Sequence, residues 1–340
     1  MADVRVALLG YGMAGREIHA PLLRDAPGVR LTHVVTGNTE RAAAAAEENP
    51  GVHVVASLAE LWQFSGALDL VVVASPTGAH AENALAAIDH GIPVVVDKPL
   101  SVDGPTGDRI VAAADKRSVP LTVFQNRRWD SEHLTARAVL GSGLLGEIVR
   151  YEARFERWRP IPKSRWRENV PSYDGGGLLM DLQSHLVDGA LDLLGPVSSV
   201  YAELASLTTV GDDVAFLALR HHSGVVSHLS ATSLAAAPGP RMRLLGRDAT
   251  YLVAGGEGEP TAFADWADRE ETQRGWLVRG EERDPVRRAP GSWGEFYPAV
   301  VEMLRGSAPA PVAPAEALEV LRVLDAARVS AAESRVVSLD

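Results

Sequence analysis

Val4-Arg5-Val6-Ala7-Leu8-Leu9 is a short apolar segment that runs directly into Gly10-Tyr11-Gly12-Met13-Ala14-Gly15, and a helical pattern follows. This order of strand, glycine turn and helix turns a G-x-G-x-x-G match into a credible dinucleotide-binding turn rather than a glycine-rich turn of another α/β protein. Gly10 permits the tight turn, Gly12 lets the backbone approach a pyrophosphate, and Gly15 lets the helix pack on the strand. The helix N-terminus then offers free N–H groups to the phosphates.

The composition describes a globular chain of 340 residues, which is too long for one comfortable core and suits two domains. No apolar run has the length of a membrane span, and residues 4–9 are too short for a secretory signal, so a cytoplasmic location is expected. The absence of cysteine excludes disulfides and thiolate chemistry. A net charge of −11 repels nucleic acid, so the expected partner is a small molecule.

The first 125 residues alternate apolar runs with helical patterns. Strands are expected at 4–9, 31–36, 52–56, 68–74, 93–97 and 121–125, with helices between them, such as 41–48, 79–90 and 107–117. Runs such as Val71-Val72-Val73 suit a parallel sheet that is buried on both faces. The prediction is an α/β fold in which residues 1–125 form a doubly wound Rossmann domain, with ligands at the carboxyl ends of the strands.

Residues 126–340 show a different pattern, in which strands follow one another with turns between them. Strands are expected at 150–156, 197–207, 214–219, 225–232 and 242–245, and these predict an antiparallel sheet. Residues 214–219 are apolar on both faces, so helices or a second subunit must cover each face, and a partner subunit is favoured. Residues 257–290 are polar and predicted to be loop, and an amphipathic helix is expected at about 314–332.

Lys98 lies in Asp97-Lys98-Pro99, at the expected end of the fifth strand. The residue before a proline is pushed toward extended geometry, and the Lys98–Pro99 bond is a candidate for the cis form. Such a turn could aim Lys98 at a nicotinamide ring and a substrate. The alternative is a solvated lysine at a strand end, and only the position of the turn in the sheet argues against it.

Asp181 and His185 share one face of a predicted helix that follows Gly175-Gly176-Gly177. A carboxylate beside an imidazole can orient it, and a histidine that titrates near neutrality suits general acid–base catalysis. From the spacing alone, a surface ion pair without function is the better interpretation. The three glycines weaken that interpretation, because they would let a ligand approach the backbone.

The glycine motif, Lys98-Pro99 and the Asp181–His185 helix together resemble the glucose–fructose oxidoreductase/inositol dehydrogenase (Gfo/Idh/MocA) family across nearly the whole chain. Residues 126–130, 165–168 and 181–188 resemble its scyllo-inositol dehydrogenase branch. The resemblance implies a Rossmann domain and a second α/β domain with an open, mainly antiparallel sheet that often mediates oligomers, here a homodimer or homotetramer. It also implies a nicotinamide cofactor, a sugar or polyol substrate, and Lys98, Asp181 and His185 in the active site.

Two residues depart from the family pattern. Asp97 stands where the family commonly has Glu, and its shorter side chain would hold Lys98 differently. Gln183 stands where the family often has Gly, and its amide would narrow the pocket or contact the ligand. Neither departure removes a group that transfers protons, so the prediction of an enzyme is kept.

The expected cofactor is NADP, with NAD as the alternative. NAD enzymes usually place an acid at the end of the second strand, and this chain has none there. Thr36, Asn38 and Arg41 could accept a 2′-phosphate, although Asn38 stands where many NADP enzymes have Arg. The residues expected at the cofactor are Gly10, Tyr11, Gly12, Met13, Ala14, Gly15, Thr36, Asn38, Arg41, Ser75, Pro76, Thr77, His80, Asp97, Lys98 and Asn126. His80 is as readily interpreted as an ordinary helix-start residue.

The expected substrate contacts are Arg127, Trp158, Trp166, Arg167 and Gln183. Aromatic faces and guanidinium groups suit polyols, although core packing is at least as good an explanation of each tryptophan. The basic cluster from Arg150 to Arg167 contains interleaved acids and is interpreted as a solvated or subunit-facing surface. No metal is expected, because no H-x-H or H-E-x-x-H spacing occurs.

The predicted reaction is reversible hydride transfer between a secondary alcohol and nicotinamide C4. His185 would take the hydroxyl proton, Lys98 would hydrogen-bond the same oxygen, and Asp181 would orient the substrate hydroxyls and hold the imidazole or Lys98 in place. Two alternatives remain open: a non-catalytic sensor or regulator of the same fold, and a reductase of a keto-sugar or an aldehyde. The intact trio argues against the sensor.

Overall fold

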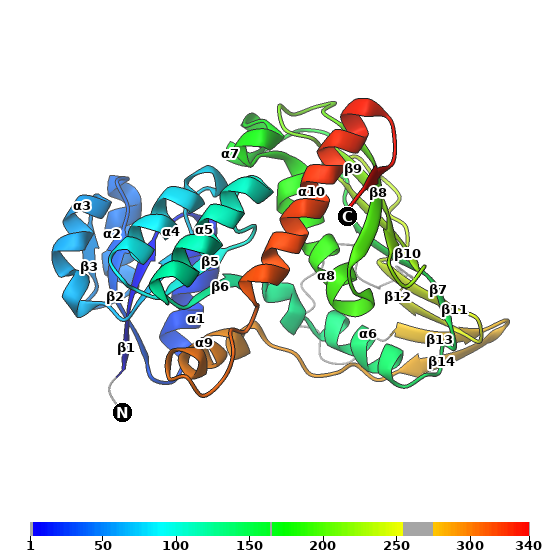
Figure 1. Cartoon of the computed structure of the whole chain (residues 1–340), viewed down its shortest axis with the longest axis horizontal. Coiled ribbons are helices and arrows are strands. Elements are labelled where there is room, and N and C mark those ends of the chain that lie inside the picture. The colour runs from blue at the N-terminus through cyan, green and yellow to red at the C-terminus, as the bar shows by residue number, and fades with distance from the viewer. Residues whose placement is uncertain (1–2, 164, 254–274, 340) are drawn as a thin grey trace. The chain divides into compact units, whose positions relative to one another are not determined.

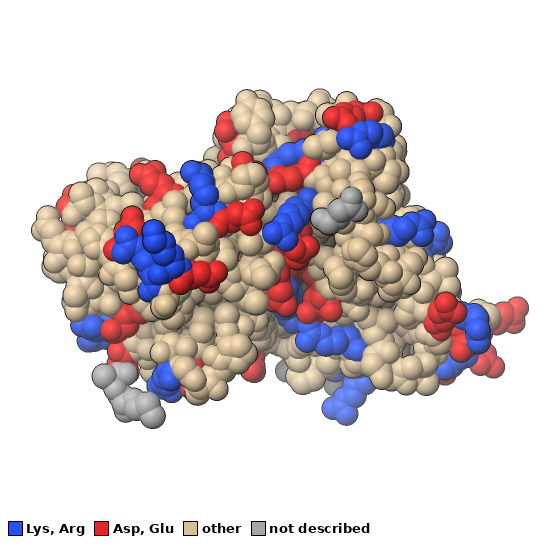
Figure 2. Space-filling model, viewed as in Figure 1, with Lys and Arg blue, Asp and Glu red and all other residues tan. Residues whose placement is uncertain are grey.

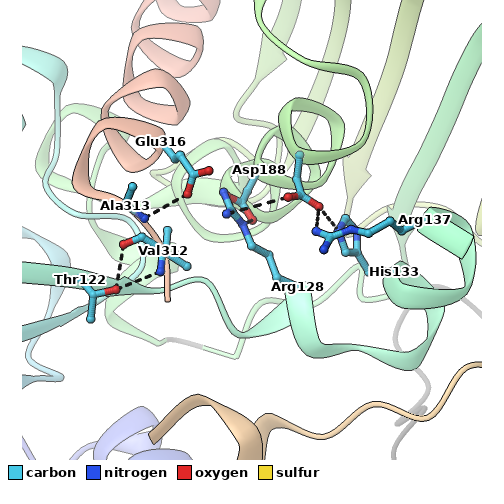
Figure 3. A network of polar contacts seen from close by, with 9 residues as sticks. Thr122, Arg128, His133, Arg137, Asp188, Val312, Ala313 and Glu316 are labelled. Atoms are coloured by element: carbon cyan, nitrogen blue, oxygen red, sulfur yellow. Dashed lines mark hydrogen bonds and ion pairs between the residues drawn. The ribbon is translucent and has the colours of Figure 1, made fainter. Parts of the chain in front are cut away.

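The structure is a computed structural model that describes residues 3–163, 165–253 and 275–339. The chain divides into two compact units (Figure 1). Unit 1 contains Met1–Gln125 and Trp293–Leu318, and unit 2 contains Asn126–Ser292 and Glu319–Asp340. The sequence prediction places 293–318 in the second domain, but this segment packs on the first sheet. Phe296 meets Phe124 at 4.8 Å between ring centroids, and Thr122 Oγ1 donates to the Val312 carbonyl at 2.8 Å (Figure 3).

The sheet of unit 1 is parallel and has the strand order β3-β2-β1-β4-β5-β6, which confirms the predicted doubly wound fold. Its strands are β1 (Val4–Leu9), β2 (Val29–Val35), β3 (His53–Val55), β4 (Leu70–Val73), β5 (Val94–Asp97) and β6 (Leu121–Phe124). Every residue of β4, β5 and β6 is buried, because helices cover both faces of the sheet. The predicted strands differ from these only at their ends.

The α-helices of unit 1 are α1 (Ala20–Asp25), α2 (Thr39–Glu48), α3 (Leu58–Leu61), α4 (His80–Asp89), α5 (Gly104–Arg117) and α9 (Phe296–Leu304). The 3₁₀ helices are Trp62–Ala67, Thr77–Ala79 and Trp293–Glu295, and a π-helical turn, Ala14–His19, precedes α1. Asn38 and Asp103 cap α2 and α5 by accepting from a backbone N–H three residues on. Helix α10 (Pro314–Glu333) begins in unit 1 and continues in unit 2, at the predicted position.

The sheet of unit 2 is mixed and mainly antiparallel, with the strand order β14-β13-β12-β11-β7-β10-β9-β8-β15. Only the β7–β10 pair is parallel among the described strands of this sheet. The strands are β7 (Ile148–Glu156), β8 (Val197–Ala205), β9 (Val214–His221), β10 (Val226–Thr232), β11 (Met242–Gly246), β12 (Thr250–Val253), β13 (Gly275–Arg279), β14 (Glu282–Val286) and β15 (Val337–Ser338).

The loop predicted over 257–290 is wrong where the structure describes it. Residues 275–286 form the β13–β14 hairpin, and the buried Leu277 of β13 pairs with Tyr251 of the neighbouring strand β12. The charged residues of β14 hide the strand pattern in the sequence, because its side chains are mostly exposed. Residues 257–274 of that prediction lie outside the described residues.

The α-helices of unit 2 are α6 (Ser131–Gly141), α7 (Trp166–Asn169) and α8 (Ser184–Leu194), with 3₁₀ helices at Asn126–Trp129 and Ser172–Asp174. A π-helical turn, Leu179–Gln183, precedes α8, which packs on β7 and β10. Ion pairs join α8 to the segments before it: Arg128 of the 3₁₀ helix Asn126–Trp129 makes a buried pair with Asp188, with its nearest contact at 2.7 Å (Figure 3). From α6, the buried His133 and the exposed Arg137 both bind Asp192 of α8.

Candidate functional site

The glycine turn has the geometry that a phosphate-binding turn needs. Gly10 has φ +100°, and a β-carbon there would lie 2.7 Å from the Ala74 carbonyl oxygen. A β-carbon on Gly15 would lie 2.1 Å from the Gly10 carbonyl oxygen. Around Gly12 the nearest described atom to such a β-carbon is Nη1 of Arg41, at 4.0 Å. Gly10 and Gly15 are therefore required by packing, whereas Gly12 leaves open space beside a guanidinium.

Tyr11 anchors the turn through its side chain. The ring is 2% exposed, and its hydroxyl donates to Glu48 Oε2 and accepts from Asn49 Nδ2, both at 2.8 Å. Burial and the Glu48 carboxylate raise the pKa of Tyr11. The predicted cofactor contact at Tyr11 is therefore restricted to its backbone, while the neighbouring Met13 is exposed.

The end of β2 leads into the start of α2. Asn38 Oδ1 accepts from the Arg41 N–H at 2.9 Å and caps α2, and Thr36 Oγ1 accepts from the Asn38 N–H at 3.4 Å. The Asn38 oxygen is thus used by the helix. Arg41 is exposed and lies beside Gly12, so its guanidinium is the cationic group of this segment nearest to the glycine turn.

His80 joins the loops that follow β4 and β5. Its Nδ1 lies 2.8 Å from the Pro99 carbonyl oxygen, and its Nε2 lies 3.0 Å from the Ser75 carbonyl oxygen. The side chain is buried, and burial lowers its pKa, although the Asp97 carboxylate opposes the shift. His80 therefore acts on the predicted cofactor residues Ser75, Pro76 and Thr77 by holding their loop, and Thr77 is itself buried.

The backbone of Lys98 is held by the buried carboxylate of Asp97. The Lys98–Pro99 bond is cis, and the Asp97 Oδ1 accepts from the Lys98 N–H at 2.8 Å. Burial raises the pKa of Asp97, but His19, Lys98 and His80 outweigh burial and lower it overall. His19 Nε2 lies 3.9 Å from Asp97 Oδ1, and its Nδ1 lies 2.6 Å from the Tyr297 hydroxyl. The shorter side chain of Asp97 is thus held within the core.

Gly176 and Gly177, two of the three glycines before the Asp181 helix, serve packing rather than ligand approach. A β-carbon on Gly176 would lie 1.8 Å from the Val170 carbonyl oxygen, and one on Gly177 would lie 2.2 Å from Asp212 Oδ1. The predicted approach of a ligand to this backbone is wrong at these two positions, because the protein itself fills the space. The glycines let the 165–175 segment and the turn at Asp212 close on the start of the helix.

Asp181 lines an open hollow of about 550 Å³ in unit 2. Arg167 Nε lies 3.4 Å from Asp181 Oδ1, and the Arg167 guanidinium lies 4.9 Å from the centre of the Trp166 ring. Burial, then the charge of Arg159, lowers the pKa of Arg157. The lining residues are Arg157, Arg159, Pro162, Arg165, Arg167, Glu168, Gly177, Leu178, Asp181, Thr208, Thr209, Asp212, Asp213 and Ser233.

His185 lines a second hollow of unit 2, of about 400 Å³. The His185 ring meets the Phe155 ring edge-on, with 6.3 Å between the ring centroids. The Arg127 guanidinium lies 4.7 Å from the centre of the Phe155 ring. Arg127 also pairs with Asp130 at 2.9 Å. The structure thus groups Asp181 with Arg167 and His185 with Arg127, one helical turn apart.

The other predicted substrate residues have separate surroundings. Gln183 is fully buried, and its Nε2 donates to the Ala215 and Leu229 carbonyls at 2.8 and 3.1 Å. The predicted contact of Gln183 with the ligand is therefore not seen: its side chain links the helix to strands β9 and β10 instead. Trp158 is 60% exposed, which excludes core packing, and Asn126 is buried at the start of its 3₁₀ helix.

Sequence reasoning missed several residues of the Asp181 hollow, namely Arg157, Arg159, Arg165 and Asp212. The Arg150–Arg167 cluster, predicted to be a solvated or subunit-facing surface, contributes these arginines to the lining of the open hollow, and Arg165 among them is exposed. Their position directly after strand β7 could have indicated a site. Nothing in the sequence around Asp212 indicated a site, because Asp212 reaches the helix start only in the folded chain, 33 positions from Leu179.

Within residues 3–163, 165–253 and 275–339, no group of three or more His, Asp or Glu side chains is placed to hold a metal. In the same part of the chain, no helix combines the length and apolarity of a membrane span. Figure 2 shows acidic and basic side chains interspersed over the visible face.

Comparison with known proteins places this geometry in context. Residues 4–125 match the model described as the oxidoreductase family with an NAD-binding Rossmann fold, and residues 133–252 match the GFO/IDH/MocA C-terminal domain. The chain is 30% identical to the scyllo-inositol 2-dehydrogenase (NADP(+)) IolW of Bacillus subtilis, over 99% of this chain and 96% of that protein.

Two further proteins are similar over nearly their full length. The uncharacterized oxidoreductase YdgJ of Escherichia coli is 33% identical, with 95% of each chain covered. The solved structure of YPO2259 from Yersinia pestis superposes with a TM-score of 0.87 at 30% identity and covers 100% of this chain and 98% of that one. Both domains of the chain, and their order, are thus shared with these proteins.

Proposed function

Because the chain belongs to the GFO/IDH/MocA oxidoreductase family, we propose that it is a dehydrogenase that oxidises a secondary hydroxyl of an inositol or sugar, with NADP preferred over NAD. The observation that carries the proposal is the helix start in unit 2. It presents an acid and a histidine, Asp181 and His185, one turn apart in two solvent-accessible hollows.

Each proposed role follows from the chemistry of the group. His185 accepts the hydroxyl proton as its alkoxide forms, because a neutral imidazole is a general base near neutral pH. Lys98 donates a hydrogen bond to the same oxygen and stabilises its developing negative charge. Asp181, held by Arg167, accepts hydrogen bonds from the substrate hydroxyls and fixes their orientation.

The cofactor fits the residues that are present in unit 1. The open side of Gly12 leaves room for a pyrophosphate, and the Arg41 guanidinium beside it is suited to a 2′-phosphate. When bound, the nicotinamide would supply the hydride acceptor for the reaction. Ser75, Pro76 and Thr77, held by His80, and Asn126 are the proposed neighbours of the ring. IolW is named as an NADP(+) enzyme, and its similarity to this chain supports NADP.

The charge of the Asp181 hollow supports a neutral substrate. Four arginines, 157, 159, 165 and 167, are matched by four acids, Glu168, Asp181, Asp212 and Asp213, so the formal charge of the lining is zero. Such a lining offers both donors and acceptors and has no net charge that would select an anion. The proposed substrate contacts are Arg127, Trp158, Trp166 and Arg167. The scyllo-inositol for which IolW is named is a neutral polyol, which supports this substrate class.

A substrate panel tests the proposal. We expect the purified protein to reduce NADP⁺ with one or more inositols or neutral sugars, and to do so more slowly with NAD⁺. Sugar acids and sugar phosphates serve as charged controls and should be poor substrates. Tight cofactor binding without turnover of any alcohol, keto-sugar or aldehyde would favour a sensor instead, and turnover only in the reductive direction would favour a reductase.

We also propose that the outer face of the unit 2 sheet forms a homo-oligomer interface. On β9 the side chains of Val214, Phe216 and Ala218 alternate with the buried Ala215, Leu217 and Leu219. Phe216 meets the His228 ring of β10 edge-on at 5.9 Å on the same side. An apolar strip of this kind on an open sheet suits burial against a second copy, which light scattering would detect as a dimer or tetramer.

A further inference from the structure

Asp212 holds the start of the helix that carries Asp181 and His185. Its backbone carbonyl accepts from the Leu178 N–H at 2.8 Å, and its Oδ2 accepts from the Leu179 N–H at 2.6 Å. The first N–H groups of a helix have no partner within the helix, so another group must satisfy them. A single residue from the turn between β8 and β9 does so here, 33 positions along the chain from Leu179.

Glycines on both sides make this contact possible. Gly177 has φ +77°, and a β-carbon there would lie 2.2 Å from Asp212 Oδ1. A β-carbon on Gly211 would lie 2.5 Å from the Gly177 nitrogen. Two glycines, one on each segment, thus allow the carboxylate to reach the helix start, which indicates that the approach is built into the fold.

The Asp212 carboxylate is buried, so its ionised form costs more free energy than that of a solvent-exposed helix cap. It is 6% exposed, and burial raises its pKa to about 6 despite the hydrogen bonds from the backbone, chiefly that of Leu179. Among the described residues, Oδ1 finds no hydrogen-bond partner, and Asp212 lines the same hollow as Asp181. Arg328 of α10 is one charged group near it, and the other charged residues that line the hollow are Arg157, Arg159, Arg165, Arg167, Glu168, Asp181 and Asp213.

We propose that Asp212 is a positioning residue of the reaction, whose ionised carboxylate fixes the π-helical turn that aims Asp181 and, one turn later, His185. The dipole of the helix attracts a negative charge at its N-terminus, so the charge strengthens the local hold on the helix start, although burying this charge lowers the stability of the fold as a whole. The proposal rests on the roles given above to Asp181 and His185.

Two variants separate the charge from the hydrogen bond. Asp212→Asn keeps an acceptor for the Leu179 N–H and removes the charge. We expect kcat to fall about tenfold, with KM for cofactor unchanged. In the wild type, both His185 and Asp212 must be deprotonated, so log kcat should fall with a slope approaching two at acidic pH, whereas the variant should show a slope of one.

Asp212→Ala removes the acceptor as well, and is examined without substrate. Hydrogen exchange of the amides of residues 178–185 should become about tenfold faster than in the wild type. Asp213→Asn is the matched control, because Asp213 is equally buried but binds the Leu207 and Thr208 N–H groups at 2.9 and 2.7 Å. Asp213→Asn should keep the wild-type exchange rates over residues 178–185. Its log kcat should still fall with a slope approaching two at acidic pH, whatever the value of kcat itself.

Either of two results overturns the inference: a wild-type acid slope in Asp212→Asn, or wild-type exchange over 178–185 in Asp212→Ala. The exchange measurement needs no turnover. If the wild type oxidises no polyol at all, the proposed function fails, and the exchange of Asp212→Ala still decides whether Asp212 holds the helix.

Discussion

Arg41 is the residue on which the proposed cofactor preference depends. It is exposed, and its guanidinium lies beside the open side of Gly12. We expect Arg41→Ala to weaken NADPH binding about tenfold, since a charge-assisted hydrogen bond to a phosphate contributes roughly 1.5 kcal/mol or more. NADH, which lacks the 2′-phosphate, should bind as before, and fluorescence titration with both cofactors measures the difference.

Arg109→Ala is the matched control, because Arg109 is another exposed arginine of unit 1 and bonds to Thr106 within its own helix. It should leave both affinities unchanged. An equal loss of NADPH and NADH affinity in Arg41→Ala would show that Arg41 does not read the phosphate.

At the residue scale, the sequence identified candidate groups better than the directions of their side chains. Asp181 and Arg167, predicted separately, lie together in one hollow. Tyr11 and Gln183 belong to the core instead, because their polar ends find partners far along the chain, Glu48 and the Ala215 carbonyl. Such partners depend on the tertiary fold, which the local pattern of polar and apolar residues does not contain.

At the scale of elements, the close packing at Gly176 is the steric condition for the helix start. We expect Gly176→Ala to lower the free energy of unfolding by about 3 kcal/mol, because the new β-carbon would meet the Val170 carbonyl oxygen at 1.8 Å. Gly141→Ala, at the end of α6 with no described atom within 4 Å, should raise it by about 0.5 kcal/mol. Urea unfolding compares the two, and similar values for both would contradict the packing argument.

The buried Asp212 predicts a pH dependence of stability with a definite sign. Burial raises its pKa to about 6 in the folded chain, from an ordinary value of 3.8. The folded state therefore binds more protons between these two values and loses stability as pH rises through them. The free energy of unfolding of the wild type, relative to Asp212→Asn, should fall by about 2 kcal/mol from pH 4.5 to pH 7. A constant difference over this range would show that Asp212 titrates normally.

Prediction of elements succeeded where periodicity was strong. The six strands of the parallel sheet and helix α10 were located because buried valines and an amphipathic pattern mark them. The β13–β14 hairpin was missed because β14 exposes most of its side chains and so shows no apolar alternation. The π-helical turns before α1 and α8 were not predicted, since they differ from an α-helix in hydrogen bonding rather than in residue pattern.

At the scale of the whole molecule, the alternation of strands and helices determined the class of the fold, and the change of pattern after Gln125 indicated a second unit. The return of residues 293–318 to unit 1 could not be predicted, because it depends on contacts such as Phe124 with Phe296 and Thr122 with Val312. The function followed from motifs that lie in both units, and the family relationship supports it.

The most direct test of the central claim compares the wild type with His185→Ala, using NADP⁺ and the best polyol of the panel. The wild type should reduce NADP⁺, and the variant should turn over at least about 10²-fold more slowly, because general base catalysis typically contributes that factor. NADPH should bind both proteins with similar affinity. Equal turnover by the two proteins would contradict the proposed role of His185 and, with it, the account of the site.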